Sequence, residues 1–501
     1  MTQRMYKGLS YVPERMDFML DLIVRGGTVV TASETFKADI GVEGEKISYI
    51  ASPGKLDYLV NENADKGNVT KIVDARGKYV MPGLIEPHMH VMAPFSNTID
   101  ILDFYTASIC AAFGGVTTFM DFSTTSNDVP VLQAVEERKA EMADSVLDYS
   151  VHAKFINAGN SQEELRETVK RLVEDGIPTF KMFTIYPGVM INDADILKIM
   201  KAAKQEGALC GFHAESSAIA DFMKQDLLTE GRQDWEFFNK AKPNACEAEA
   251  VNRILTFSEL LDVPVYFYHL STKEAVDMVR QAKKRGVKVQ AETCGHYLTL
   301  TDDKNKGDNG INYLMSPPLR SEEDRKAMWE GLKDGTLSLV TSDNEVFSRK
   351  IKEQDLKDDA LTNGKVPNFS IPVNGIPGLE ERFGLLMIGV NLGIISLNKL
   401  VEVSSTNPAK VFGCYPEKGV LEVGSDADII VVNPEKTVPL VRENLHYPAD
   451  LDYDLYEGFI SQGWPVCTIR RGEILVENGM FKGRRKSGRF LKCSLKPPRE
   501  A

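Results

Sequence analysis

Four of the seven histidines directly follow short apolar segments of the kind that form buried strands. His88 and His90 enclose a single residue at the end of the segment Tyr79-Val-Met-Pro-Gly-Leu-Ile-Glu-Pro87. Residues two apart in extended backbone point to the same side, so both imidazoles can face one metal ion. One His-x-His pair is weak support for a metal site, because two histidines satisfied inside a core give the same pattern.

Three further residues strengthen the metal interpretation. His213 and His269 each end an apolar segment, although each alone could be a core histidine bonded to a backbone carbonyl. Asp343 closes the segment Ser338-Leu-Val-Thr-Ser342, where a buried carboxylate is costly unless it is paired or bound to a metal. A turn or a helix N-cap is the other interpretation of Asp343. Taken together, the four histidines and Asp343 predict one shared cluster.

Lys181 is the least expected member of this group. It lies within Pro178-Thr-Phe-Lys-Met-Phe-Thr-Ile-Tyr186, which is typical of a buried strand. An unpaired ammonium group is strongly disfavoured there. Lys181 is therefore either a lysine at an exposed strand end or a lysine that has been neutralised chemically. Reaction of the neutral amine with CO2 gives a carbamate, whose two oxygens can bridge two cations.

The elements that must position these residues alternate between short apolar segments and longer segments with helical spacing. Helical spacing covers Ser161–Asp175, Glu247–Leu261 and Lys273–Lys284. This alternation predicts an α/β fold, a (β/α)8 barrel with its active site at the C-terminal ends of the strands. An open doubly wound sheet is the alternative, but no glycine-rich phosphate loop follows the first strand. The candidate strands are Val80–Ile85, Val116–Phe122, Ser150–Ile156, Thr179–Thr184, Ala208–Ala214, Val263–Leu270, Val287–Glu292 and Ser338–Asp343.

The two ends of the chain differ from this pattern. Short strands separated by turn signals occupy Leu20–Val80, and similar strands recur at Ala427–Val432 and Cys467–Val476. These distant pieces are expected to pair. The predicted division is a smaller β-sandwich domain of residues 1–78 and 405–475, a catalytic barrel of residues 79–404, and a C-terminal tail of residues 476–501.

Composition excludes several classes of protein. A net charge of −13 argues against nucleic acid as a partner, and the basic cluster Lys482–Lys492 is interpreted as a solvated or partner-facing tail. The sequence shows no hydrophobic core of a signal peptide. It also has no apolar run of the ~20 residues needed to cross a bilayer, so no membrane partner is expected. Seven cysteines without paired spacing favour a reducing compartment. The protein is expected in the cytoplasm.

Several motifs, in the same order, resemble the cyclic amidohydrolases that include dihydropyrimidinase and hydantoinase. The likeness extends from about Leu20 to about Leu491. It is carried by Pro82-Gly-Leu-Ile-Glu-Pro-His-Met-His90, Phe180-Lys-Met-Phe-Thr-Ile-Tyr186, Gly211-Phe-His-Ala-Glu215, Tyr268-His-Leu-Ser271, Ala291-Glu-Thr-Cys294, Ser316-Pro-Pro-Leu-Arg320, Asn374-Gly-Ile-Pro-Gly378, Ser405-Thr-Asn-Pro-Ala-Lys410 and Gly424-Ser-Asp-Ala-Asp428.

The resemblance implies a role for each site residue. One metal ion would be held by His88, His90, carboxylated Lys181 and Asp343, and a second by Lys181, His213 and His269. Tyr186 would donate a hydrogen bond to the developing oxyanion, and backbone groups of Ser316 and Asn374 would hold the amide edge of the substrate. Zinc is the expected metal and manganese would fit the same ligands. The resemblance also implies a homotetramer in which the segment after Tyr453 reaches a neighbouring subunit.

The reaction expected from this resemblance is the opening of a dihydropyrimidine or hydantoin ring to an N-carbamoyl amino acid. A metal-bridged hydroxide would attack the ring carbonyl, and Asp343 would take the proton and return it to the leaving nitrogen. Two departures from the family stand beside these ligands. Glu86 replaces the usual Asp before Pro87, and Asn344-Glu345-Val346 replaces the usual His-Cys-Pro after the aspartate.

Other functions stay open. Dihydroorotase shares the barrel and metals but resembles a pattern with an arginine where this chain has Met92. An allantoinase-like cyclic ureide hydrolase would use the same ligands. A non-catalytic scaffold of the same fold is the alternative from another class, although all six ligand positions here hold ligating residue types.

Overall fold

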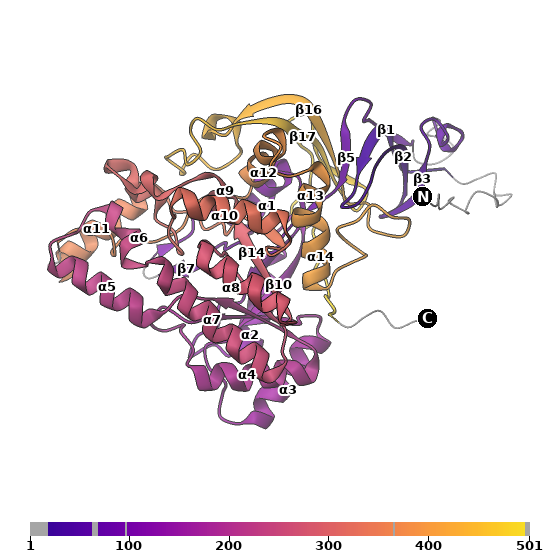
Figure 1. Cartoon of the computed structure of the whole chain (residues 1–501). Helices are drawn as coiled ribbons and strands as arrows, with labels where there is room; N and C mark the ends of the chain where they lie inside the picture. The colour runs from indigo at the N-terminus through magenta and orange to yellow at the C-terminus, as the bar shows by residue number, and fades with distance from the viewer. Residues whose placement is uncertain (1–18, 63–68, 96–97, 364–365, 496–501) are drawn as a thin grey trace.

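The computed structural model describes residues 19–62, 69–95, 98–363 and 366–495 (Figure 1). Within these residues, eight parallel strands form one sheet in the order β15-β14-β13-β12-β11-β10-β9-β6. Consecutive strands lie side by side, which is the arrangement of a (β/α)8 barrel and confirms the predicted fold class. The strands are β6 (Leu84–Glu86), β9 (Val116–Phe122), β10 (Asp148–Lys154), β11 (Thr179–Phe183), β12 (Leu209–His213), β13 (Val265–Phe267), β14 (Val289–Cys294) and β15 (Leu339–Thr341).

The first and last strands are joined just beyond their C-terminal ends. The backbone N–H of Asp343 donates to the carbonyl of His88 at 2.9 Å, and that of His90 donates to the carbonyl of Asn344 at 2.7 Å. Met89 and Asn344 form a parallel bridge at the same place. The residues predicted to bind metal therefore also bring the two edges of the barrel together.

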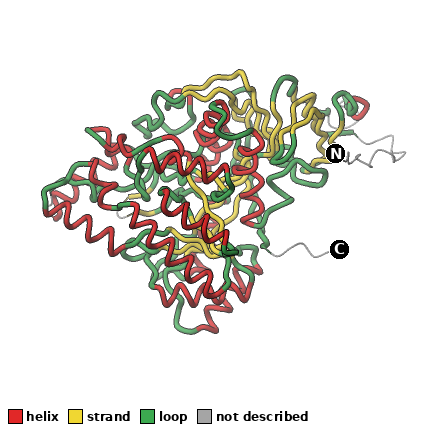
Figure 2. Tube along the Cα trace, viewed as in Figure 1, coloured by secondary structure: helices red, strands yellow, loops and turns green. Residues whose placement is uncertain are grey.

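Helices surround these strands (Figure 2). The three helices predicted from spacing are confirmed as α3 (Gln162–Glu174), α7 (Asn244–Leu261) and α8 (Lys273–Lys284). The side chain of Ser161 caps α3 by accepting from the backbone N–H of Glu164 at 3.2 Å. Other helices are α1 (Phe104–Phe113), α2 (Val131–Met142), α4 (Asp193–Glu206), α5 (Ser217–Thr229), α6 (Phe238–Ala241), α9 (Gly295–Thr299), α10 (Glu322–Lys333), α11 (Arg349–Asn363), α12 (Glu381–Asn391), α13 (Leu397–Val401) and α14 (Asn407–Phe412).

The predicted strand Val80–Ile85 is two strands in different sheets. β5 (Tyr79–Pro82) pairs with β16 and β1, whereas β6 pairs with β9 of the barrel. Gly83 separates them, and a Cβ atom at this position would overlap the side chain of Thr117. The chain thus crosses between sheets at a point where only glycine fits, which apolar periodicity does not reveal.

The second sheet is built from both ends of the chain. Within the described residues it has nine strands, in the order β19-β18-β17-β16-β5-β1-β2-β3, with β4 paired to β1. Figure 1 shows its indigo and yellow strands side by side. Its other strands are β1 (Leu22–Val30), β2 (Thr35–Glu43), β3 (Lys46–Ala51), β4 (Lys71–Asp74), β16 (Ile429–Pro439), β17 (Ile460–Arg470), β18 (Glu473–Glu477) and β19 (Met480–Phe481). The domain limits predicted above stay a prediction.

The C-terminal segment returns to the barrel of its own chain. The backbone N–H of Tyr149 donates to the carbonyl of Arg489 at 3.0 Å, and that of Cys493 donates to Gly176 at 2.9 Å. The side chain of Arg489 pairs with Glu45 at 2.6 Å. Arg489 thus pairs with an acid of its own chain while its side chain stays 39% exposed. The interpretation of Lys482–Lys492 as a solvated or partner-facing tail stays a prediction.

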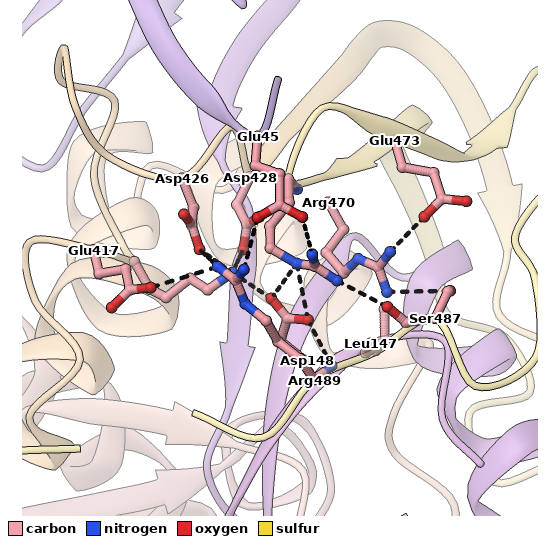
Figure 3. A network of polar contacts seen from close by, with 12 residues as sticks. Glu45, Leu147, Asp148, Glu417, Asp426, Asp428, Arg470, Glu473, Ser487 and Arg489 are labelled. Carbon is pink, nitrogen blue, oxygen red and sulfur yellow. Dashed lines mark hydrogen bonds and ion pairs between the residues drawn. The ribbon is translucent and has the colours of Figure 1, made fainter. Parts of the chain in front are cut away.

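A buried ionic network holds this junction together (Figure 3). The ammonium of Lys418 is 2.7 Å from Asp148, 2.9 Å from Asp426 and 2.8 Å from Asp428. Asp148 begins barrel strand β10, whereas Asp428 directly precedes β16 of the second sheet. Lys418 is 1% exposed, so these pairs are shielded from water and join the two sheets firmly.

In the described part of the chain, no helix has the length and apolar character needed to span a membrane. The seven cysteines are buried free thiols.

Candidate metal centre

Five barrel strands deliver the predicted ligands to one end of the barrel. His213 is the last residue of β12, Lys181 lies within β11, and His269 follows β13 by two residues. His88 and Asp343 likewise follow β6 and β15 by two residues. Because the strands are parallel, their C-terminal ends meet, and side chains far apart in the sequence converge there.

Three of these residues form a group that can hold a metal ion. The ligand atoms of His88, His90 and Asp343 all lie within 4.8 Å of one another. His88 Nε2 is 2.9 Å from Asp343 Oδ1, and His90 Nε2 is 3.5 Å from the same oxygen. The other ring nitrogen of His88 binds Glu292, which fixes the ring so that Nε2 faces the group.

His213 and His269 lie directly beside this group. Their ring centroids are 4.4 Å apart, and the ring of His269 is 5.2 Å from that of His88. His213 Nε2 is 2.8 Å from Glu215 Oε2, which leaves Nδ1 of His213 for another partner. Nδ1 of His269 is buried and has no hydrogen-bond partner among the described residues. Orphaned buried nitrogens are costly, so this donor set fits a second ion.

Lys181 is 1% exposed and lies between aromatic rings. Its Nζ is 3.6 Å from the ring centroid of Tyr268 and 4.7 Å from that of Phe122. Among the residues that the structure describes, no carboxylate oxygen lies within 4.0 Å of this nitrogen. Burial lowers the pKa of Lys181 to about 7. A large fraction of the amine is therefore uncharged near neutral pH, which is the form that reacts with CO2.

The backbone is strained at three of the predicted site residues. Tyr186, His269 and Asp343 have φ angles of 80°, 38° and 48°. Positive φ is uncommon for residues other than glycine and clusters at functional sites. The surrounding barrel holds these side chains in conformations that they would not adopt in a flexible loop.

The predicted substrate-binding residues meet at a lysine that sequence analysis missed. The ammonium of Lys242 is 2.9 Å from each of Tyr186 Oη, Ser316 Oγ and Glu215 Oε2. The amide nitrogen of Asn374 donates to the same Ser316 oxygen at 3.3 Å. Lys242 stands between α6 and α7 in the sequence, next to Pro243, where nothing distinguishes it from a surface lysine. Glu215, in contrast, lies within the motif Gly211-Phe-His-Ala-Glu215.

Glu86 and Asn344, which depart from the family pattern, stabilise the backbone around the predicted ligands. Glu86 is fully buried, accepts from the backbone N–H of His88 at 3.0 Å and pairs with Arg382 at 3.2 Å. Asn344 is also buried, and its side-chain oxygen accepts from the N–H of Gly378 at 3.2 Å. Both residues hold backbone in place around the predicted ligands.

Comparison with known proteins shows the family to which the chain belongs. A model of the amidohydrolase family matches residues 79–475. The chain belongs to the amidohydrolase family. Among curated relatives, the D-hydantoinase of Ralstonia pickettii is 35% identical over 94% of this chain and 99% of its own length. The D-hydantoinase of Geobacillus stearothermophilus is 33% identical over 94% of this chain and 96% of its own length.

Solved structures of family members superpose on the whole fold. The dihydropyrimidinase of Brevibacillus agri has a TM-score of 0.87 and 33% identity, and the match covers 95% of this chain and 99% of that one. A D-hydantoinase from a Bacillus species has a TM-score of 0.86 and 33% identity, with 94% of this chain and 99% of that chain covered. These two proteins therefore share nearly the whole fold of this chain.

Proposed function

We propose that this amidohydrolase hydrolyses a C–N bond of a cyclic amide or imide and opens a dihydropyrimidine or hydantoin ring to an N-carbamoyl amino acid. The observation that carries the proposal is the convergence of His88, His90 and Asp343 beside a buried, unpaired Lys181. The names of its relatives, D-hydantoinase and dihydropyrimidinase, support the same class of substrate.

The donor set fits two divalent metal ions, with zinc first and manganese as the alternative. One ion would be held by His88, His90 and Asp343, and the other by His213 and His269. Carboxylated Lys181 would be a ligand of both ions. When bound, such a pair of ions polarises a carbonyl and lowers the pKa of water. The burial of Lys181 supports its carboxylation, because a carbamate removes the cost of an isolated ammonium.

Asp343 is the proposed general base. Burial opposes its ionisation, but the imidazoles of His88 and His90 hold the pKa of the Asp343 carboxyl well below its usual range. Asp343 is therefore an acceptor that can take the proton of the attacking water and return it to the leaving nitrogen. Its strained backbone and its contact with His88 fix the position of the carboxylate.

Tyr186 is the proposed donor to the oxyanion. Burial raises the pKa of Tyr186 to about 12, so the phenol keeps its proton at neutral pH and can donate it in a hydrogen bond. Ser316 and Asn374 lie against the same cluster and are proposed to hold the amide edge of the ring with their backbone groups.

Replacing Asp343 with Asn tests this function. Ring opening is measured by absorbance with dihydrouracil, hydantoins and allantoin as substrates. The metal-loaded variant should open none of these rings. It should still bind the substrate that the unmodified protein turns over. Turnover of allantoin alone by the unmodified protein would favour a cyclic ureide hydrolase. Retained turnover by Asp343→Asn would refute the assignment of the base. A protein that takes up no metal and opens none of these rings would be a scaffold.

We further propose a cytoplasmic homotetramer. Buried free cysteines suit a reducing compartment. Large apolar side chains stay exposed on helices of the isolated chain, including Phe222 at 68% and Leu361 at 85%, and a partner subunit would cover them. Light scattering after size exclusion measures the mass, and a monomer would contradict this proposal.

A further inference from the structure

We propose that Lys242 is a positioning residue of this site: its ammonium directs the hydroxyl proton of Tyr186 toward the substrate and ties Tyr186, Ser316 and Glu215 into one unit. The identity of the reaction that Lys242 assists rests on the proposed function. The orienting role itself rests only on contacts within the chain.

The three contacts of Lys242 match its hydrogen-bonding capacity. A lysine ammonium has three N–H donors and no acceptor. Its Nζ is 2.9 Å from each of three oxygens, on Tyr186, Glu215 and Ser316. Each proton of Lys242 therefore has an acceptor, and each of the three oxygens must accept at this contact.

This requirement restricts the direction of the Tyr186 hydroxyl proton. A phenol has a single proton, and the Tyr186 oxygen already accepts from Lys242. The proton is therefore left to point elsewhere. Lys242 also lies over the face of the Tyr186 ring, with Nζ 4.8 Å from the ring centroid, so the whole side chain is held. Without the ammonium, the hydroxyl could turn toward Glu215 or Ser316.

Ser316 depends on Lys242 in the same way. Its hydroxyl oxygen accepts from Lys242 at 2.9 Å and from the amide of Asn374 at 3.3 Å. Both residues proposed to hold the substrate ring are thus connected to Tyr186 through one ammonium.

The position of Lys242 is itself well fixed. Lys242 is 8% exposed, and the carboxylate of Glu215 neutralises it while also contacting His213. The Lys242 carbonyl accepts from the guanidinium of Arg320. Lys242 follows the end of α6 directly, and Pro243 precedes α7. A charge so enclosed is costly to keep, which favours a role at the site over an incidental placement.

The test combines Lys242→Met with Tyr186→Phe, both in the metal-loaded protein. Lys242→Met should lower kcat about 100-fold, as expected for the loss of an oriented oxyanion donor, and change KM less. In the Tyr186→Phe background the same substitution should have a much smaller effect, because the oriented proton is already gone. Lys242→Arg should restore part of kcat. Lys240→Met, on an exposed residue of α6, is the matched control and should leave kcat unchanged.

A crystal structure of Lys242→Met tests whether Lys242 holds the Tyr186 and Ser316 side chains in place, without any turnover. The hydroxyl oxygens of Tyr186 and Ser316 should have shifted from their positions in the unmodified protein, whereas they should keep these positions in Lys240→Met. The proposal would be overturned if Tyr186 and Ser316 had not moved in Lys242→Met. It would also be overturned if Lys242→Met lowered kcat equally with Tyr186 and with Phe at this position. A wild-type protein that opens no cyclic amide would instead refute the proposed function, and the crystal structure would still decide the role of Lys242.

Discussion

His88 Nε2 and Asp343 Oδ1 lie 2.9 Å apart and join the ends of the first and last barrel strands. The backbones of the same two residues are hydrogen-bonded at 2.9 Å. The predicted ligands therefore also close the barrel, and occupation of the site should stabilise the whole fold.

Metal removal tests this relationship. A chelator should lower the thermal unfolding temperature, and added Zn2+ or Mn2+ should restore it, because a ligand that binds only the folded state stabilises it by mass action. At a free metal concentration of 100 times Kd, the gain per site is about 2.7 kcal/mol. Identical unfolding curves before and after chelation, in a protein shown to contain metal, would contradict the coupling.

Lys181 should be essential for metal binding rather than for folding. Lys181→Met keeps an unbranched apolar stem in the aromatic pocket but cannot become an anion, so bound metal should fall sharply and ring opening should be lost. Lys201→Met, on the exposed face of α4 (Asp193–Glu206), serves as the control. Mass spectrometry of metal content checks the result, and full occupancy of both sites in Lys181→Met would refute a bridging role.

Glu381 should make stability fall as pH rises. It is 2% exposed, its carboxylate accepts from the Tyr447 hydroxyl at 2.7 Å, and burial raises its pKa from 4.5 to about 7. Between these two values the folded chain holds more protons than the unfolded chain, so stability is lost with rising pH by up to about 1.4 kcal/mol per unit.

The test compares Glu381→Gln with the unmodified protein in urea unfolding at pH 5 and pH 8. The amide cannot ionise, so the variant should lose less stability over this interval. Glu435→Gln, on an exposed side chain of β16, should behave like the unmodified protein. Parallel losses in all three proteins would mean that Glu381 is not the group responsible.

Lys418 should be required for stability, because its removal takes a buried cationic partner from Asp148, Asp426 and Asp428. Breaking a buried ion pair by removal of one partner costs about 3 to 5 kcal/mol. Lys418→Met should therefore unfold at a markedly lower denaturant concentration than Lys410→Met, which alters an exposed lysine of α14. Equal midpoints for the two variants would show that the ion pairs of Lys418 contribute little.

Sequence patterns predicted the barrel well because apolar strands and amphipathic helices alternate at regular intervals. They predicted the convergence of His88, His213 and Asp343 for the same reason, since each lies at or just beyond the C-terminal end of a strand. The break at Gly83 escaped prediction because β5 and β6 are both apolar, and only the approach of Thr117 reveals that the chain changes sheets.

Other features could not be predicted because they depend on contacts between distant segments. Lys242 has no local signal, since its three partners come from separate parts of the chain. The basic residues near the C-terminus have the composition of a solvated tail, and only the fold places Arg489 against Glu45 and Asp426. Pairing of buried charges is a property of tertiary structure rather than of spacing.

The most direct measurement is a high-resolution crystal structure of the protein purified with Zn2+ and bicarbonate. We predict carboxyl density on Lys181 Nζ and two anomalous peaks, one near His88 and His90 and one near His213 and His269. A bare Lys181 amine, with no ion beside His213 or His269, would contradict the proposed chemistry.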